Sequence, residues 1–159
     1  MGVNTEGREI LHYFEPGLFF TDLRATTKDG VLKELTDRIA RGHGVRDPEL
    51  LLEMLKRRES LGSTGIGKGV AIPHGRSLAI SELRVLFGLS KRGVNFDAID
   101  DEPVHIFFLI VAPPQDKHNE YLPLLGKIAE LVKDKKVRDR LIEIQEFDEL
   151  RGLLEEKFS

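Results

Sequence analysis

The sequence has no cysteine and no long hydrophobic run. Without cysteine, disulfide frameworks, thiolate zinc sites, thiol nucleophiles and iron–sulfur clusters are excluded together. The longest apolar run covers residues 106–112 and stops at Pro113 and Pro114. That is far below the roughly 20 residues that a membrane-spanning helix needs. We therefore expect neither a disulfide-bonded fold nor insertion into a membrane.

A large excess of charge of one sign is absent as well. The chain carries 24 Lys and Arg against 27 Asp and Glu, a formal net charge of −3. This balance is wrong for a protein that mainly binds polyanions, so nucleic acid is not an expected partner. The first residues lack a basic start followed by an apolar stretch and a small-residue cleavage site. We expect no secretion signal and a cytoplasmic protein.

The composition is that of one globular domain. With 159 residues, 40% hydrophobic and 32% charged, the chain is long enough for one sizeable core and short for two. Gly7, Pro16 and Gly17 interrupt the beginning of the chain. We therefore expect residues 1–17 to be an N-terminal extension packed loosely on a single compact domain of residues 18–159.

Apolar side chains recur at helical spacing in several segments. Thr27 is placed to cap the first of these helices, and Asp47 followed by Pro48 is a strong start signal for the second. The predicted helices cover residues 28–41, 48–60, 122–132 and 148–156.

Strands are predicted in the middle of the chain. Residues 83–89 and 104–111 read as strands, and the second is apolar at nearly every position, as expected when helices cover both faces of a sheet. Shorter strands are predicted at residues 70–72 and 94–96. Residues 62–75 hold five of the 15 glycines and predict a loop. The expected fold class is α/β, with a central mixed sheet flanked by helices on both faces.

Residues 62–69 also fit the beginning of a nucleotide-binding P-loop, G-x-x-x-x-G-K. Three features argue against a P-loop. Gly69 stands where a Ser or Thr should reach magnesium, the preceding segment is helical rather than a strand, and Pro73 prevents a helix from starting directly afterwards. The same segment makes better chemical sense when it is read through to His74.

His74 lies between Pro73, which restricts the backbone, and Gly75, which has no side chain, so its imidazole can be presented openly in a turn. A neutral imidazole is a competent nucleophile near physiological pH. For a phosphoryl group on this ring, the donors would be an arginine, the Ser63 and Thr64 hydroxyls and backbone N–H groups of the glycine loop. No metal or other cofactor is required. The alternative is a turn histidine whose ring only satisfies a backbone carbonyl.

Arg58-Glu59 and residues 62–76 together resemble the active-site signature of enzyme IIA domains of the bacterial phosphoenolpyruvate-dependent phosphotransferase system, of the fructose/mannitol type that includes the nitrogen-regulatory branch. The resemblance continues through residues 96–104 and 122–129 and leaves out residues 1–17. It implies that His74 accepts a phosphoryl group from the phosphohistidine of an HPr-like carrier, with Arg58 beside the phosphate. The phosphate-binding residues are then Ser63, Thr64, Gly65 and Gly75.

The sequence departs from this family at one position. The family often has a second active-site histidine, followed by leucines, at the start of the helix after the last strand. Aligning Leu122 with the first leucine puts Tyr121 at that position, and His118 lies three residues earlier. Either His118 reaches the site, or the Tyr121 hydroxyl supplies the hydrogen bond.

Several functions fit these residues. The leading hypothesis is a histidine phosphocarrier that acts as a nitrogen-regulatory-type signalling protein on a target protein. Alternatives are a sugar-specific IIA that passes the phosphoryl group to a IIB domain, and a IIA-like binding module that is not phosphorylated. A hydrolase using Ser63 is disfavoured because nothing resembles a nucleophile elbow. Lys68 and Arg76 could attract an acidic or phosphorylated partner. His105 is expected in the core or at a strand edge, and His12 and His43 are assigned no function.

Overall fold

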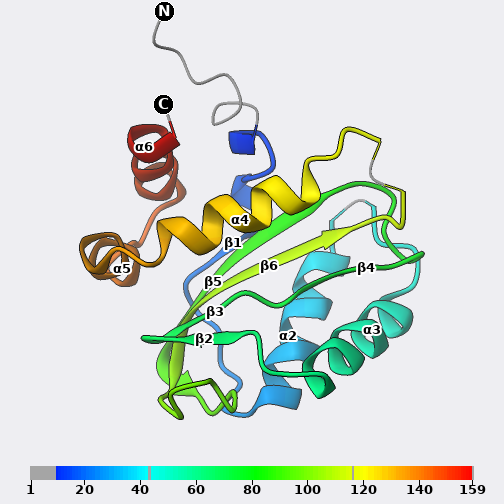
Figure 1. The fold of residues 1–159 in the computed structure, drawn as a ribbon, viewed down its shortest axis with the longest axis horizontal. Helices are drawn as coiled ribbons and strands as arrows, with labels where there is room; N and C mark the ends of the chain where they lie inside the picture. Colours follow the sequence, from blue (N-terminus) through cyan, green and yellow to red (C-terminus); the bar gives the residue numbers. More distant parts are fainter. Residues whose placement is uncertain (1–9, 43, 116, 159) are drawn as a thin grey trace, which may run out of the picture.

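The computed structural model describes residues 10–42, 44–115 and 117–158. These form one α/β unit in which a mixed sheet lies between two layers of helices, as predicted (Figure 1). The elements, in chain order, are η1 (Pro16–Leu18), β1 (Phe19–Phe20), α2 (Lys28–Ala40), α3 (Pro48–Ser60), β2 (Gly65–Gly67), β3 (Val70–Ala71), β4 (His74–Arg76), β5 (Arg84–Val94), β6 (Val104–Ala112), α4 (Tyr121–Leu131), α5 (Lys135–Ile142) and α6 (Phe147–Phe158).

The sheet is built around the antiparallel pair of β5 and β6. Its order is β1-β5-β6-β3-β2, and β4 also pairs with β6. Both β3 and β4 run parallel to β6 on the same edge, β3 beside Ile106 and Phe107 and β4 beside residues 110–112. The N–H of Ile110 donates to the carbonyl of Pro73 between them. Residues 70–76 therefore form one interrupted strand along β6.

The side chains of β6 alternate between two cores. Ile106, Phe108 and Ile110 face the layer of α4, α5 and α6, whereas Phe107 and Leu109 face the layer of α2 and α3 (Figure 1). This alternation is the period of two that a strand imposes. It explains why β6 is apolar at nearly every position, because each face is covered by helices.

The helices next to the site begin where the sequence predicts. The Thr27 hydroxyl accepts a hydrogen bond from the N–H of Gly30 at the start of α2, and the Asp47 carboxylate accepts one from the N–H of Leu50 at the start of α3. These side chains satisfy N–H groups that have no partner within the helix. The end of α3 at Ser60 leads directly into the glycine-rich segment.

Residues 62–75 are more regular than the predicted loop. They contain the hairpin of β2 and β3, whose turn at Lys68 and Gly69 has positive φ angles of 58° and 81°. Two such residues in sequence are what a two-residue hairpin turn requires. His74 is correspondingly in the short strand β4, not in a turn. The many glycines correctly predicted positive φ angles, but they also led to the prediction of a loop where the structure has paired strands.

Two further differences concern the end of a strand and one helix. The strand predicted at residues 94–96 is the end of β5, which reaches Val94, and Asn95 only forms an isolated bridge to Thr27. Helix α5 was not predicted: it has eight residues and buries only Val137 and Leu141, which leaves too little periodicity to detect.

The N-terminal segment packs more tightly than expected where it is described. Residues 10 and 11 are helical, and the side chains of Ile10 and Phe14 are buried in the core below α4 and α6. Residues 1–9 lie outside the described residues, so the domain boundary at residue 18 remains a prediction. Within the described ranges, none of the helices is long and apolar enough to cross a membrane.

Candidate phosphoryl-transfer site

His74 is held against the sheet by strand β4. It lies opposite Ile110 in the parallel pairing of β4 with β6, and its side chain is half-buried. Helix α3 packs closely over this strand: a Cβ added at Gly75 would lie 2.2 Å from Sδ of Met54. Glycine at this position therefore allows the middle of α3 to pack closely against β4.

The ring of His74 has a defined tautomer. Nδ1 lies 2.6 Å from the carbonyl oxygen of Ile72. A carbonyl oxygen only accepts hydrogen bonds, so Nδ1 carries the proton and donates, and Nε2 of the neutral ring keeps its lone pair. Burial is the largest influence and lowers the pKa of His74, and the charge of Arg58 lowers it further, whereas the Ile72 hydrogen bond and the charge of Glu59 raise it. The ring is therefore held in its neutral, nucleophilic form at neutral pH.

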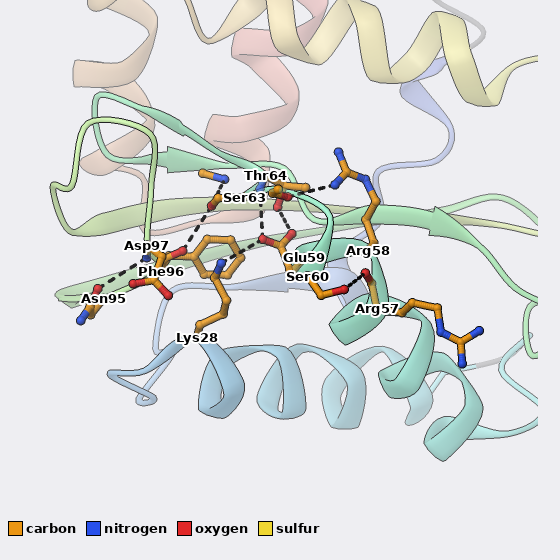
Figure 2. A network of polar contacts seen from close by, with 12 residues as sticks. Lys28, Arg57, Arg58, Glu59, Ser60, Ser63, Thr64, Asn95, Phe96 and Asp97 are labelled. Atoms are coloured by element: carbon orange, nitrogen blue, oxygen red, sulfur yellow. Dashed lines mark hydrogen bonds and ion pairs between the residues drawn. The ribbon is translucent and has the colours of Figure 1, made fainter.

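Arg58 supplies a fixed positive charge beside this ring. It lies in the last turn of α3, and its Nη1 donates to the carbonyl of Gly62 at 3.0 Å (Figure 2). The guanidinium lowers the pKa of both His74 and Tyr121, which places it within electrostatic reach of the two rings. A half-buried guanidinium anchored to the backbone can receive a phosphate without reorganising.

Tyr121, the first residue of α4, lies beside His74. The two ring centroids are 6.5 Å apart with the rings tilted by 50°, and the guanidinium carbon of Arg76 lies 4.8 Å above the Tyr121 ring. Burial raises the pKa of the phenol, and the charges of Arg76 and Arg58 oppose the rise. The phenol therefore stays protonated at neutral pH and can act as a donor.

Arg76 was expected only as a flanking charge that attracts a partner. Its stacking on Tyr121 puts a second cation at the site. Residues two apart in a strand lie on the same face. The spacing of His74 and Arg76 therefore predicts that both side chains lie at the site, but only if residues 74–76 are known to be a strand.

His118 is placed differently. It is exposed in the turn before α4 and lines a cavity of about 640 Å³ with residues that include Leu78, Pro113 and Lys117. Among the ring contacts of the described residues, none joins His118 to His74. Of the two candidates for the second position, the structure brings Tyr121 next to His74.

Ser63, Thr64 and Gly65 lie in the predicted segment, but their polar groups have partners within the protein. The Ser63 hydroxyl donates to the carbonyl of Phe96 at 3.2 Å and accepts from the N–H of Gly65 at 3.0 Å. The buried Thr64 hydroxyl donates to the carboxylate of Glu59 (Figure 2). These contacts brace the loop, so a phosphate role for the three residues remains a prediction that requires exchange of partners.

Two more observations complete the site. A Cβ added at Gly65 would lie 2.9 Å from the backbone Cα of Ala98, so glycine is needed for the loop to pack there. No cluster of three or more histidine, aspartate or glutamate side chains within the described residues is arranged to hold a metal ion.

Comparison with known proteins places this arrangement in a family. The family profile described as phosphoenolpyruvate-dependent sugar phosphotransferase system, EIIA 2, matches residues 12–157. A nitrogen regulatory protein of Pseudomonas aeruginosa is 37% identical over 127 residues, 79% of this chain and 81% of that protein. The fructose-specific EIIA component of Haloferax volcanii is 32% identical over 130 residues, 82% of this chain and 84% of that protein.

The fold agrees with these sequence matches. The crystal structure of the nitrogen regulatory protein IIA-Ntr from Neisseria meningitidis superposes with a TM-score of 0.84 at 30% identity, and the match covers 92% of this chain and 99% of that one. The chain spans only 21% of the fructose-specific EIIABC component of Bacillus subtilis, to which it is 29% identical. The profile match, the relatives and the fold lead to one conclusion: the chain belongs to the EIIA type 2 family and is a phosphotransferase component of the phosphoenolpyruvate-dependent sugar phosphotransferase system.

Proposed function

We propose that Nε2 of His74 accepts the phosphoryl group from the phosphohistidine of an HPr-like carrier protein. The lone pair of Nε2 attacks phosphorus, and the N–P bond of the donor breaks with its electron pair returning to the donor imidazole. The proton on Nδ1 of His74 stays in its hydrogen bond to Ile72 throughout. No proton has to leave the accepting nitrogen, because the tautomer already keeps it free.

The observation that carries this proposal is the 2.6 Å contact between Nδ1 of His74 and the Ile72 carbonyl. This contact is the one expected of a histidine that only bonds a backbone carbonyl. It also leaves the lone pair of Nε2 available for attack on phosphorus. The positive charges of Arg58 and Arg76 lie around the two rings and suit the charge of an incoming phosphoryl group.

The surroundings of the site fit a protein donor. Leu61, Leu78 and Leu122 are exposed by 80%, 74% and 66%, and each lies within three residues of Arg58, Arg76 or Tyr121 in the sequence. Exposed apolar side chains are a feature of docking surfaces. A partner that covers them would also exclude water from the transfer.

Mass spectrometry tests the acceptor directly. The chain is incubated with phosphoenolpyruvate and the two general phosphotransferase proteins, and its intact mass is measured beside those of His74→Ala and His105→Ala. We expect one acid-labile phosphoryl group on the wild type and on His105→Ala, and none on His74→Ala. An unmodified wild type, under conditions that phosphorylate a known IIA, contradicts the proposal and favours a binding module.

We further propose that the phosphorylated chain acts as a nitrogen-regulatory-type signal. The similarity to nitrogen regulatory proteins supports this role, and the similarity to fructose-specific EIIA keeps transfer to a IIB domain as the second candidate. The phosphorylated chain is mixed with fructose-type and mannitol-type IIB domains. We expect it to keep its phosphoryl group for as long as it does alone. Rapid transfer to either IIB contradicts the regulatory role and establishes the sugar-specific one.

A further inference from the structure

A buried carboxylate lies directly below the site and takes no part in the transfer proposed above. Glu59, at the end of α3, is only 7% exposed. Its two oxygens accept hydrogen bonds from Thr64, Oε1 from the backbone N–H at 3.0 Å and Oε2 from the hydroxyl (Figure 2). One side chain therefore holds both the backbone and the side chain of Thr64.

Lys28 balances the charge of this carboxylate. Its Nζ lies 3.3 Å from Oε1 of Glu59, its side chain is 18% exposed, and it lies 4.9 Å above the ring of Phe96 (Figure 2). Burying a carboxylate is costly unless it is paired and hydrogen-bonded. The ion pair and the two Thr64 bonds together hold the Glu59 side chain in place.

Backbone hydrogen bonds continue from Thr64 to the histidine. The carbonyl of Thr64 accepts from the N–H of Ile72 at 3.0 Å, and the carbonyl of Ile72 accepts from Nδ1 of His74 at 2.6 Å. On the other side of Ile72, the ring of Pro73 restricts the backbone and the Pro73 carbonyl is held by the N–H of Ile110. The Ile72 carbonyl, which accepts the hydrogen bond from His74, is thus fixed by contacts on both sides of Ile72. Glu59 anchors the side formed by Thr64.

We propose that Glu59, supported by Lys28, is a positioning residue that sets the Nδ1–H tautomer of His74 through Thr64 and Ile72. The opposite tautomer would turn a lone pair of Nδ1 toward the Ile72 carbonyl oxygen, which is repulsive as long as that carbonyl cannot rotate away. The role of this tautomer in phosphoryl transfer rests on the function proposed above, whereas the tautomer itself is a property of the unphosphorylated protein.

Two double variants separate the hydrogen bonds of Glu59 from its charge. Lys28→Met with Glu59→Gln removes both charges but keeps an amide that can bond the Thr64 N–H and hydroxyl. Lys28→Met with Glu59→Leu removes the charges and both bonds. Glu34→Leu is the remote control, because Glu34 also accepts backbone N–H groups, those of Arg24 and Ala25, on another part of the molecule.

The tautomer is measured from the ¹⁵N chemical shifts of the His74 ring in the unphosphorylated proteins. We expect the Nδ1–H form to dominate in the wild type, in Glu34→Leu and in the Gln double variant. In the Leu double variant the ratio of Nδ1–H to Nε2–H forms should fall by about 2- to 12-fold, the factor that the loss of one hydrogen bond implies. The rate of phosphorylation should follow the fraction of His74 rings in the Nδ1–H form, so in the Leu double variant it should fall by a smaller factor than the ratio does, and it should stay unchanged in Glu34→Leu.

Three results would overturn this inference: a wild-type His74 that is mainly Nε2–H, a folded Leu double variant that keeps the wild-type ratio, or a Gln double variant that loses it as fully as the Leu variant. The wild-type spectrum tests the Nδ1–H tautomer even if the Leu double variant does not fold. A wild type that shows the expected tautomer but gains no phosphoryl group would refute the proposed transfer and leave the positioning role intact.

Discussion

His74 and His105 are held by the same device in two different surroundings. Each ring is half-buried, and each Nδ1 donates to a backbone carbonyl, that of Ile72 at 2.6 Å for His74 and that of Ser90 at 2.8 Å for His105. In this tautomer the lone pair of a neutral ring lies on Nε2. The tautomer alone therefore does not single out His74, the proposed phosphoryl acceptor, from His105.

The difference lies in what surrounds Nε2. A Cβ added at Gly93 would lie 3.2 Å from Nε2 of His105, so backbone lies against the reactive edge of that ring. The contacts found for the described residues place no arginine at His105, whereas Arg58 and Arg76 lie at the His74 site. The comparison favours the two arginines, rather than the tautomer, as the feature that distinguishes the proposed acceptor His74 from His105.

The largest effect is expected from removing Arg58, the cation that lies near His74 but not near His105. Arg58→Met should lower the rate of phosphorylation of His74 by about 10²-fold or more, because a fixed donor for the transferred group is lost. The matched control is Arg57→Met, since Arg57 is the exposed neighbour whose guanidinium pairs with Glu53. Rates from quenched reactions analysed by mass spectrometry give both values. Equal rates for Arg58→Met and the control would show that the cation is not what singles out His74.

A smaller effect is expected at the second position of the site. Tyr121→Phe removes the hydroxyl but keeps the ring under Arg76, and should slow phosphorylation by about 2- to 12-fold, the worth of one hydrogen bond. His118→Ala should leave the rate unchanged. The same quenched-flow assay compares the two variants. The reverse pattern would mean that His118 moves into the site when the donor binds.

The smallest effect is expected from pH. The pKa of His74 is lowered below 6.5, chiefly by burial. The ring is then more than half neutral at pH 6.5, so the rate attributable to this group should rise less than about twofold between pH 6.5 and 8. A titration of the His74 ring by NMR and rates across that range check the prediction. A ring that titrates above pH 6.5 would contradict it.

The lowered pKa of His74 also makes the free energy of unfolding depend on pH. Between the lowered pKa and 6.5 the unfolded chain binds more protons than the folded one, so the free energy of unfolding rises with pH in this window. The contribution is complete above pH 6.5 and is lost as the pH falls through the pKa of the folded state. Urea unfolding of the wild type and His74→Gln should therefore diverge in this acidic window and run parallel above it.

Elements with local signals were predictable from the sequence. The caps at Thr27 and Asp47 and the helical spacing after them determine where α2 and α3 begin, because the required partners lie within four residues. The apolar character of β6 at nearly every position likewise indicated that both sheet faces are covered. By contrast, the strand character of residues 74–76 depends on pairing with β6, which lies more than 30 residues away in the sequence.

The sequence by itself determined which segment is proposed to carry the chemistry, because residues 58–76 hold an arginine, a glycine-rich loop and a histidine in the order that resembles the family signature. Only the tertiary structure decided how the donors are used. The hydroxyl of Thr64 was expected at the phosphate but is bonded to Glu59, and Tyr121 rather than His118 lies beside His74. The physical reason is that a hydrogen-bonding group has several potential partners, and the packing of segments distant in the sequence selects among them.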